Sequence, residues 1–492
     1  MVNTIIDKAK SEKKKVFIFA HKFPDGDAVC SSIALKNYLE ANGVEAHYIV
    51  EESVTRFSPI VEPVEATHHV EDGNISVILD TTRLSYAENT LFNGSSIDDI
   101  YVIDHHEKKE GTKTIEDELG LDPSHVLRDP NSSSVCEILL REFDEKQVDK
   151  GTATALMNGL WTDTTGLTFL KDDTLDSFSK LLDMDADFEK VAERNKTKYP
   201  LASRVAIARL LIRTKKVPIG DYFGLILGVR ADEVKNMYKK FGLRSPQKRI
   251  FMMRDVENAA FVSFFAENEP GLYAAEFRSS SSFGNFDVLS LATKFGGGGH
   301  LNASGCFLRD DDGYFYDNII EMLEDEIGER YVPQAGSIKP IETNEADKEL
   351  RRILAETSDF TQGMTREVVD RIKGTIRDGA NFEYTRKGYI SFETFMLRNE
   401  ILSIVPDEVA LKRDADVEIS LAANQIEFLR EKYKVPEESI LDAISGFVGT
   451  DINSAIIRFP NGRCSKIDQN GNITYEYISQ NPEVGEQEQV QE

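Results

Sequence analysis

The stretch Val102-Ile103-Asp104-His105-His106 decides the fold class of this chain. Its apolar residues are typical of a buried strand, and the strand ends in one carboxylate followed by two imidazoles. Two earlier apolar runs, 16–20 and 77–79, also lead directly into imidazole or acidic side chains. Because ligands collect beyond the carboxyl ends of the strands in an open parallel sheet, we expect these side chains to meet at one site.

The order of apolar runs predicts an α/β protein with several domains. Short β-branched runs alternate with helical periodicity up to about residue 195, which is typical of a parallel sheet covered by helices. A smaller α/β domain and an additional C-terminal α+β unit should follow. The predicted divisions are a catalytic domain at 1–198, a connecting helix at 199–218, a substrate-binding domain at 219–332, the C-terminal unit at 345–480 and a disordered tail at 481–492.

The composition of the chain indicates which partners it is expected to bind and in which part of the cell it is expected to lie. A net charge of −27 argues against long duplex nucleic acid, since affinity for phosphate backbones comes mainly from clustered Lys and Arg. The sequence contains no apolar run long enough to cross a bilayer, so we expect no membrane partner. The four cysteines form no CxxC pair, and the N-terminus lacks the apolar core of a secretory signal, so a cytoplasmic location is expected.

The acidic and imidazole side chains form two predicted sets of metal ligands. His21, Asp25 and Asp80 make one set, and Asp27, Asp80, His105 and Asp163 make the other. Oxygen and imidazole donors without thiolates suit manganese, magnesium or zinc. Two divalent ions that share Asp80 would support hydrolysis of a phosphoester by an activated water molecule. We expect Asp104 to support a histidine and His106 to face the substrate phosphate.

Each of these motifs is ordinary by itself. Asp25-Gly26-Asp27 alone is most often a solvated turn, and a pair of adjacent histidines alone says little. The functional prediction depends on four acidic loops, three of which follow strands in alternating α/β order. A run of glycines, Gly296–Gly299, and the following His300 add a second signal, because uncovered backbone amides can approach an anion. Arg278 is the expected partner for a phosphate or carboxylate in the same domain.

Together these motifs resemble those of a known enzyme superfamily. His21-x3-Asp25-x-Asp27, Asp80, Asp104-His105-His106 and Asp163 resemble the four signature motifs of the DHH phosphoesterase superfamily. Arg278-Ser279 and the segment 295–305 resemble its DHH-associated substrate-binding domain. Within the superfamily, the chain is most similar to the branch of nanoRNases and pAp phosphatases.

The resemblance implies a manganese-dependent enzyme that degrades very short oligonucleotides and dephosphorylates 3′-phosphoadenosine 5′-phosphate (pAp). It agrees with the two divalent ions expected from the residues, which also predict Asp104 and His106 as the catalytic residues. It assigns metal binding to His21, Asp25, Asp27, Asp80, His105 and Asp163. It assigns substrate binding to Arg278 and Ser279 and to a glycine-rich loop that contains Gly298, Gly299 and His300.

Three other functions stay open at this point. The same chemistry would serve a phosphodiesterase for cyclic dinucleotides or their linear products. The long segment after residue 345 carries no chemical motif, so it could make the chain a regulatory or scaffold protein with a protein partner. An inorganic pyrophosphatase uses similar ligands but has less use for a separate glycine-rich domain. A homodimer is compatible with each of these functions.

Overall fold

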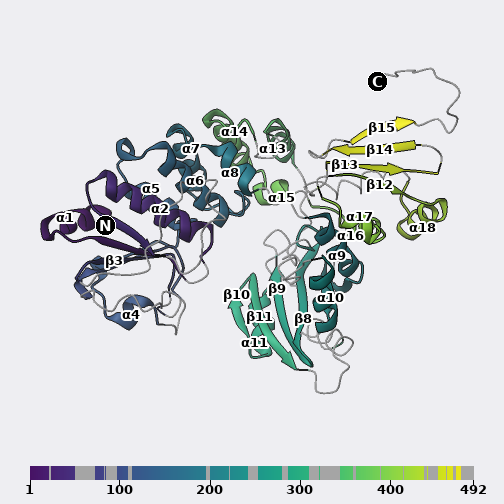
Figure 1. Cartoon of the computed structure of the whole chain (residues 1–492), viewed down its shortest axis with the longest axis horizontal. Helices are drawn as coiled ribbons and strands as arrows, with labels where there is room; N and C mark the ends of the chain where they lie inside the picture. Colours follow the sequence, from purple (N-terminus) through teal and green to yellow (C-terminus); the bar gives the residue numbers. More distant parts are fainter. Residues whose placement is uncertain are drawn as a thin grey trace. The chain divides into compact units, whose positions relative to one another are not determined.

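The chain groups into two compact units, which are drawn in the computed structural model in Figure 1. The first unit contains residues 1–196 and 343–387, and the second contains 197–342 and 388–492. The structure describes residues 1–21, 24–49, 73–82, 84, 97–108, 113–195, 200–220, 222–241, 253–279, 286–309, 321, 344–357, 362–387, 389–413, 415–436, 440, 453–460, 463–468 and 473–477.

A five-stranded parallel sheet forms the centre of the first unit. Its strands are β1 (Val16–Phe19), β2 (Ala46–Ile49), β3 (Ile75–Leu79), β4 (Ile100–Asp104) and β5 (Val126–Arg128), in the spatial order β2-β1-β3-β4-β5. Every residue of β1, β3 and β4 is buried, as expected for strands covered on both faces. The predicted α/β class with a parallel sheet is therefore confirmed.

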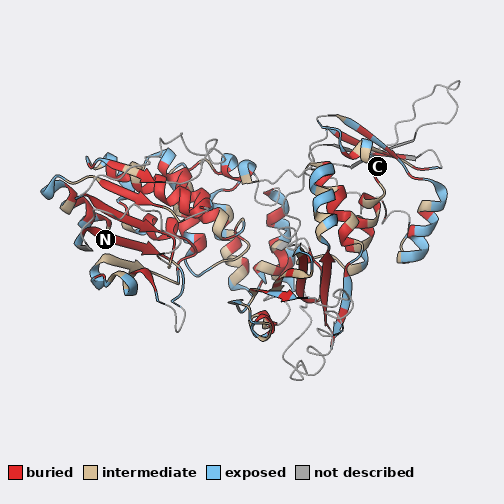
Figure 2. Ribbon diagram, turned by 60° about the horizontal axis from the view of Figure 1, so that its bottom comes forward, coloured by how far each residue is buried: buried red, intermediate tan, exposed pale blue. Residues whose placement is uncertain are grey.

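Helices supply the remaining core of the first unit. They are α1 (Val2–Glu12), α2 (Gly26–Ala41), α4 (Ile115–Leu119), α5 (Val135–Glu142), α6 (Lys150–Asp163), α7 (Thr174–Asp183) and α8 (Phe188–Asn195). Side chains from α1, α2, α5 and α6 pack with those of the sheet in one continuous apolar core, which is coloured red in Figure 2. Capping carboxylates and hydroxyls start several helices, with Asp25 on α2, Ser134 on α5 and Asp149 on α6.

Three further helices belong to the first unit although they come late in the sequence. They are α13 (Glu345–Glu356), α14 (Arg366–Arg377) and α15 (Phe382–Lys387). Leu350, Ile353 and Ile372 join the same apolar core as Phe178 of α7. Ion pairs of Arg366 with Asp183 and of Lys373 with Asp176 add to this contact.

A six-stranded mixed sheet forms the larger part of the second unit, in the order β10-β11-β9-β8-β7-β6. Its strands are β6 (Lys215–Ile219), β7 (Tyr222–Val229), β8 (Ala259–Glu269), β9 (Leu272–Ser279), β10 (Gly298–His300) and β11 (Ala303–Arg309). The helices α9 (Leu201–Leu211) and α10 (Ala231–Phe241) lie beside β8 in Figure 1. Helix α11 (Val288–Lys294) contacts β9, β10 and β11.

The rest of the second unit is a four-stranded sheet with accompanying helices. The sheet has the order β12-β13-β14-β15, made by β12 (Asp416–Ser420), β13 (Ser454–Arg458), β14 (Arg463–Asp468) and β15 (Ile473–Tyr477). The helices are α16 (Phe392–Ser403), α17 (Asp407–Ala410) and α18 (Ala423–Tyr433). Their apolar side chains share a core with Leu201, Val205 and Ala208 of α9.

The two units divide the chain differently from the sequence analysis, whose domain boundaries stay predictions. The segment 345–480, expected to form one additional unit, is shared: α13 to α15 lie in the first unit and the residues from 389 onward in the second. Amphipathic helices bury their apolar faces against any complementary surface, and here α13 and α14 share the core of the first unit. The predicted tail lies outside the described residues.

Two local expectations need correction. Lys215–Pro218 was expected to end a connecting helix, but the helix α9 ends at Leu211 and these residues belong to strand β6. Strand β6 lies at the edge of its sheet, where Pro218 is tolerated because its missing N–H breaks no essential ladder bond. Gly298 and Gly299 lie in strand β10, paired with Gly305 and Ser304, and not in a loop.

No helix in the described part of the chain is both long enough and apolar enough to span a membrane.

Replacing Ile372 by Ala should loosen helix α7 if α14 stabilises the first unit. Truncating this fully buried side chain should cost about 2–4 kcal/mol of local stability through lost contacts and a residual cavity. Hydrogen exchange of the peptide that covers Thr174–Asp183 should become faster. A Lys348→Ala protein, altered at an exposed position of α13, is the control, and equal exchange in both variants would contradict the packing.

Candidate metal centre

The predicted ligands in the first unit come from the carboxyl ends of three adjacent strands and from the ends of two helices. His21 follows β1, Asp80 follows β3, and Asp104, His105 and His106 close β4. Asp25 is the N-cap of α2, and Asp27 lies in its first turn. Asp163 is the last residue of α6. The parallel strand order β1-β3-β4 places their ends side by side, as the sequence pattern predicts.

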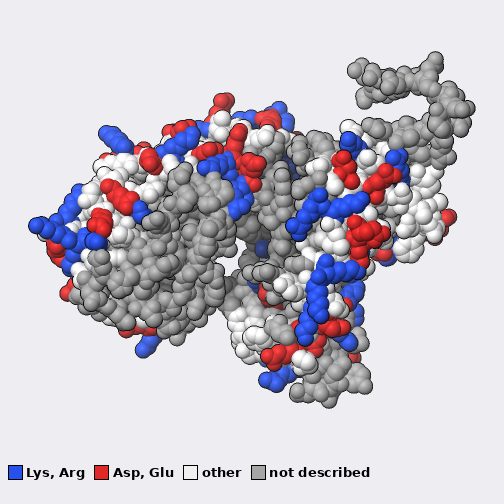
Figure 3. Space-filling view, viewed as in Figure 1, with Lys and Arg blue, Asp and Glu red and all other residues white. Residues whose placement is uncertain are grey.

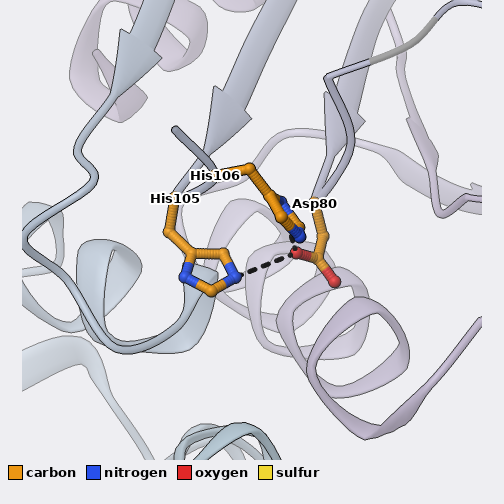
Figure 4. Close-up of side chains that lie close together, drawn as sticks. All are labelled: Asp80, His105 and His106. Carbon is orange, nitrogen blue, oxygen red and sulfur yellow. Dashed lines mark ion pairs between the residues drawn. The ribbon is translucent and has the colours of Figure 1, made fainter. Parts of the chain in front are cut away.

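Asp80 and His105 are the centre of this cluster. The Nε2 atom of His105 lies 3.5 Å from Oδ1 of Asp80 and 3.1 Å from Oδ2 of Asp163. Figure 4 shows both His105 and His106 turned toward the Asp80 carboxylate, and Nδ1 of His106 lies 3.7 Å from the same Oδ1 atom.

A second group of donors shares Asp80 from its other side. The Nε2 atom of His21 lies 3.8 Å from Oδ2 of Asp80 and 3.9 Å from Oδ1 of Asp25. Three sets of donor atoms are close enough to hold an ion, and Asp80 is common to two of them. These sets are Asp80–His105–His106, His21–Asp25–Asp80 and Asp27–His105–Asp163.

Neighbouring groups fix the orientation of both histidines. Nδ1 of His105 lies 3.3 Å from the backbone carbonyl of Ser132, and because a carbonyl only accepts, this nitrogen donates and Nε2 faces the carboxylates. Nδ1 of His106 lies 2.7 Å from Oδ1 of Asp104. The other oxygen of Asp104 accepts a hydrogen bond from Arg128, which also pairs with Glu116.

Asp27 joins the metal cluster to the start of helix α5. Its Oδ2 atom accepts a hydrogen bond from the backbone N–H of Val135 at 2.7 Å, and its Oδ1 atom accepts one from Cys136 at 3.1 Å. These two amides are among the donors that an α-helix leaves free at its N-terminus. The carboxylate therefore stays fully buried while it retains lone pairs for a metal ion.

The electrostatics of the cluster favour an added positive charge. Burial, together with the charge of Asp163, raises the pKa of Asp27 to about 7, and burial also raises the pKa of Asp80 well above its usual range. Burial alone lowers the pKa of His105, but the nearby carboxylates of Asp163 and Asp80 outweigh it and raise this pKa to about 11. The carboxylates thus hold a positively charged group in their midst.

Two observations test whether these residues fit a metal ion. Oδ1 of Asp80 and Oδ2 of Asp163 are buried without a hydrogen bond from any described residue, although buried carboxylate oxygens normally have one. Asp80 also has a left-handed backbone, with φ of +61°, which costs about 1–3 kcal/mol and is typical of functional sites. The donor set, the orphaned oxygens and the strained residue all fit divalent ions.

Two glycines allow the close approach of the helices that carry the ligands. A Cβ atom on Gly26 would lie 2.3 Å from Oγ1 of Thr162, next to Asp163. A Cβ atom on Gly159 would lie 2.2 Å from Sγ of Cys136 and 2.8 Å from Oδ1 of Asp27. The ends of α2, α5 and α6 can therefore meet only where a side chain is missing.

The residues predicted to bind substrate lie in the second unit. Arg278 and Ser279 end strand β9, and Gly298, Gly299 and His300 form β10. The Ser279 hydroxyl donates a hydrogen bond to the Asn302 side chain at 2.9 Å. Nη1 of Arg278 donates to the backbone carbonyl of Phe277 at 2.9 Å. The roles of these residues, and of the six metal donors, stay predictions.

Several residues of the centre were not singled out from the sequence. Ser132 acts through its backbone carbonyl, so its side-chain type gives no signal. Gly159 lies inside a helical segment, where a glycine costs about 1 kcal/mol relative to alanine. A glycine at such a position indicates a close contact, and this could have pointed to the residue from the sequence. Arg128 and Glu116 are distant in sequence from the Asp104 carboxylate that they support.

Comparison with known proteins matches most of this centre, all but Asp163, to a described domain. Residues 15–160 match the family model described as "DHH family, N-terminal domain". The cyclic-di-AMP phosphodiesterase PdeA of Listeria monocytogenes is 24% identical over 341 residues, which cover 63% of this chain and 47% of the relative. The bifunctional oligoribonuclease and PAP phosphatase NrnA of Thermus thermophilus is 25% identical over 328 residues, which cover 65% of this chain and 92% of the relative.

The chain thus spans about half the length of the cyclic-di-AMP phosphodiesterase that it matches. Among solved structures, an exopolyphosphatase-related protein from Bacteroides fragilis superposes with a TM-score of 0.51 at 21% identity. The superposition covers 66% of this chain and 96% of that protein, and it shows a shared fold.

Replacing Asp80 by Asn should remove most manganese binding, because this side chain belongs to two donor sets. Supporting residues alone typically contribute 10–100-fold to metal affinity, so a shared donor should contribute at least about 100-fold. Titration calorimetry with manganese measures this loss. The metal-free variant should be as thermally stable as the wild type or more so, since a buried negative charge has been removed.

Asp185→Asn is the matched control, because Asp185 is an exposed acid of the same unit that pairs only with Lys150 among the described residues. It should bind manganese like the wild type. Unchanged manganese affinity in the Asp80→Asn protein would remove Asp80 from the centre.

Replacing Gly159 by Ala should lower both thermal stability and manganese affinity. The new methyl group would overlap Cys136 and the Asp27 carboxylate, and such overpacking costs about 1–3 kcal/mol. Gly151→Ala in the same helix is the control, since the nearest atom would lie at an ordinary 3.6 Å. Thermal melts with and without manganese separate the two effects. A Gly159→Ala protein that melts and binds like Gly151→Ala would contradict the close approach.

Proposed function

Because residues 15–160 give this chain the N-terminal domain of the DHH family, we propose that it is a metal-dependent phosphoesterase that acts on short oligonucleotides and on pAp. The observation that carries the proposal is the cluster of carboxylates and imidazoles around Asp80, with its orphaned buried oxygens. Divalent ions bound there would supply positive charge against a phosphoryl group and lower the pKa of a water molecule.

The protein's own side chains have separable roles in this proposal. His105 and the carboxylates around it form the ion-binding core, and the Ser132 carbonyl holds the ring of His105 in place. His106 is half-exposed, and the contact of its Nδ1 atom with Asp104 leaves Nε2 available to a phosphate oxygen or a leaving group. Burial raises the pKa of Asp104, but the hydrogen bond and charge of His106, followed by the charge of Arg128, outweigh it and lower this pKa.

We propose short substrates because acidic residues greatly outnumber basic ones in this chain. On the face shown in Figure 3, blue Lys and Arg side chains lie next to red Asp and Glu side chains. The net charge of −27 works against binding of extended phosphate backbones. The oligoribonuclease and PAP phosphatase of Thermus thermophilus, which this chain covers almost entirely, is named for short substrates and supports the same choice.

A second candidate function is hydrolysis of a cyclic dinucleotide. The similarity to the cyclic-di-AMP phosphodiesterase of Listeria monocytogenes favours it, although this chain spans about half of that protein. The metal cluster suits either reaction, since both break a phosphodiester bond. We place the cyclic substrate second because of the better coverage of the oligoribonuclease.

In manganese, the wild-type protein should hydrolyse an RNA dinucleotide and pAp faster than cyclic di-AMP or pyrophosphate. His106→Gln should lower kcat by about 10²–10⁴-fold if His106 transfers a proton in the reaction. Its manganese affinity, measured by calorimetry, should change far less than its kcat. His47→Gln, at a histidine that pairs with Glu45, is the control and should match the wild type.

The outcomes separate the candidates. Faster turnover of cyclic di-AMP would favour the second function. Absence of turnover on every phosphoester by a manganese-loaded protein would contradict both. Full activity of the His106→Gln protein would remove this residue from the catalytic set.

A further inference from the structure

Alternate residues of strands β9 and β11 point to the same face of the six-stranded sheet. The two strands are antiparallel, with Arg278 opposite Ala303, Glu276 opposite Gly305 and Ala274 opposite Phe307. Residues directly opposite each other point to the same face, and alternate residues of one strand share a face. The intervening residues, such as Phe277 and Cys306, are buried on the other face.

Helices cover this sheet unevenly. Helix α11 lies on the buried face, where the Ser304 hydroxyl donates a hydrogen bond to the Val288 carbonyl. On the opposite face, α9 and α10 pack against Val262, Phe264 and other residues of β7 and β8. Figure 1 shows these two helices at the β8 side of the sheet, away from β10. Among the described helices, none is found on the part of this face that belongs to β9 and β11, where Phe307 and Arg309 are exposed.

Phe307 is the most unusual residue of this exposed face. Its side chain is 66% exposed, the largest fraction among the large apolar side chains that the structure describes. Its neighbours on the face are Ala274 across the ladder and Gly305 two residues before it, and both are too small to cover an aromatic ring. One exposed phenylalanine is ordinary on a protein surface, but its charged surroundings here are not.

Two guanidinium groups share the face with Phe307. Arg309 lies two residues farther along β11, about 7 Å away along the strand. Arg278 lies opposite Ala303, which is about 13 Å from Phe307 along the strand. Glu276 lies 3.4 Å from the Arg278 guanidinium, and no ion pair of Arg309 with a described residue is found. Among the described residues of this face, two arginines face one glutamate, a net excess of one positive charge beside one aromatic ring. This combination suits a ligand that carries both a flat base and phosphates.

We propose that Phe307 stacks on a base of the nucleotide substrate, while Arg278 and Arg309 face its phosphates. This inference rests on the proposed function and names the side chain that would contact the base of its substrates. Aromatic side chains stack on every base, so the contact adds affinity without requiring one particular sequence. Pyrophosphate and polyphosphate have no group that this ring would bind.

The test compares substrates with and without bases. The wild type and a Phe307→Ala protein are given an RNA dinucleotide and an abasic dinucleotide with the same sugar-phosphate backbone. Stacking of one base is worth about 1–3 kcal/mol, so KM for the RNA dinucleotide should rise roughly 5- to 100-fold in the variant. The kcat for the RNA dinucleotide should stay within about twofold of the wild-type value. Both kcat and KM for the abasic dinucleotide should also stay within about twofold.

Two further variants act as controls. Phe307→Tyr keeps the ring and should behave like the wild type. Phe428→Ala removes another aromatic side chain of the second unit, on helix α18, that is 52% exposed, and it should leave both substrates unaffected. Equal losses on the RNA and abasic dinucleotides, or no loss on either, would overturn the stacking role while leaving the proposed function intact.

A binding measurement keeps the inference testable if no substrate is turned over. A dinucleotide that contains 2-aminopurine loses fluorescence when its base stacks, and this can be measured in metal-free protein. The wild type should quench it and Phe307→Ala should not, whether or not the protein hydrolyses it. Equal quenching by both proteins would overturn the inference. The face could instead bind a second copy of the chain, and light scattering tests this alternative. A change of oligomeric state in Phe307→Ala alone would mean that a second copy covers this face and would overturn the inference.

Discussion

The close packing of α6 against α2 and α5 is the constraint on which the metal centre depends. Asp163 ends α6 and Asp27 begins α2, so these carboxylates can share an ion only if the helix ends nearly touch. Gly26 and Gly159 remove the side chains that would otherwise fill the contact. The two strand-end histidines and Asp80 then need only the ordinary geometry of a parallel sheet to reach the same place.

This packing concentrates negative charge where water is largely excluded. Two carboxylates of the cluster, Asp27 and Asp80, have raised pKa values, and burial is the first cause of both shifts. Without a cation, the unfavourable charge is partly balanced by His105 and by the backbone amides at the start of α5. A fold stabilised for itself alone would more easily place apolar side chains here, so the charge cluster has its explanation in ligand binding.

The donor residues at the strand ends could be predicted from the sequence because the pattern that marks them lies within a few consecutive residues. An apolar run followed by a donor residue, repeated at β1, β3 and β4, requires only parallel pairing to bring the donors together. The partner of α13 and α14 could not be predicted in this way, since an amphipathic helix shows which face is buried but not what covers it. The same limit applies to Ser132, whose carbonyl is common to all residue types, and to the left-handed backbone of Asp80, which no residue type required.

The metal cluster alone does not explain how a phosphoesterase of this kind would select its substrate. The match to the DHH family ends at residue 160, yet the relatives that share this similarity are named for a cyclic dinucleotide in one case and for oligoribonucleotides and PAP in another. A cluster that handles the phosphoryl group cannot by itself distinguish such substrates, because they all present the same reacting group. The distinction must come from residues that meet the rest of the molecule. For this chain we propose the β9–β11 face, which carries an exposed ring for a base and guanidinium groups for additional phosphates.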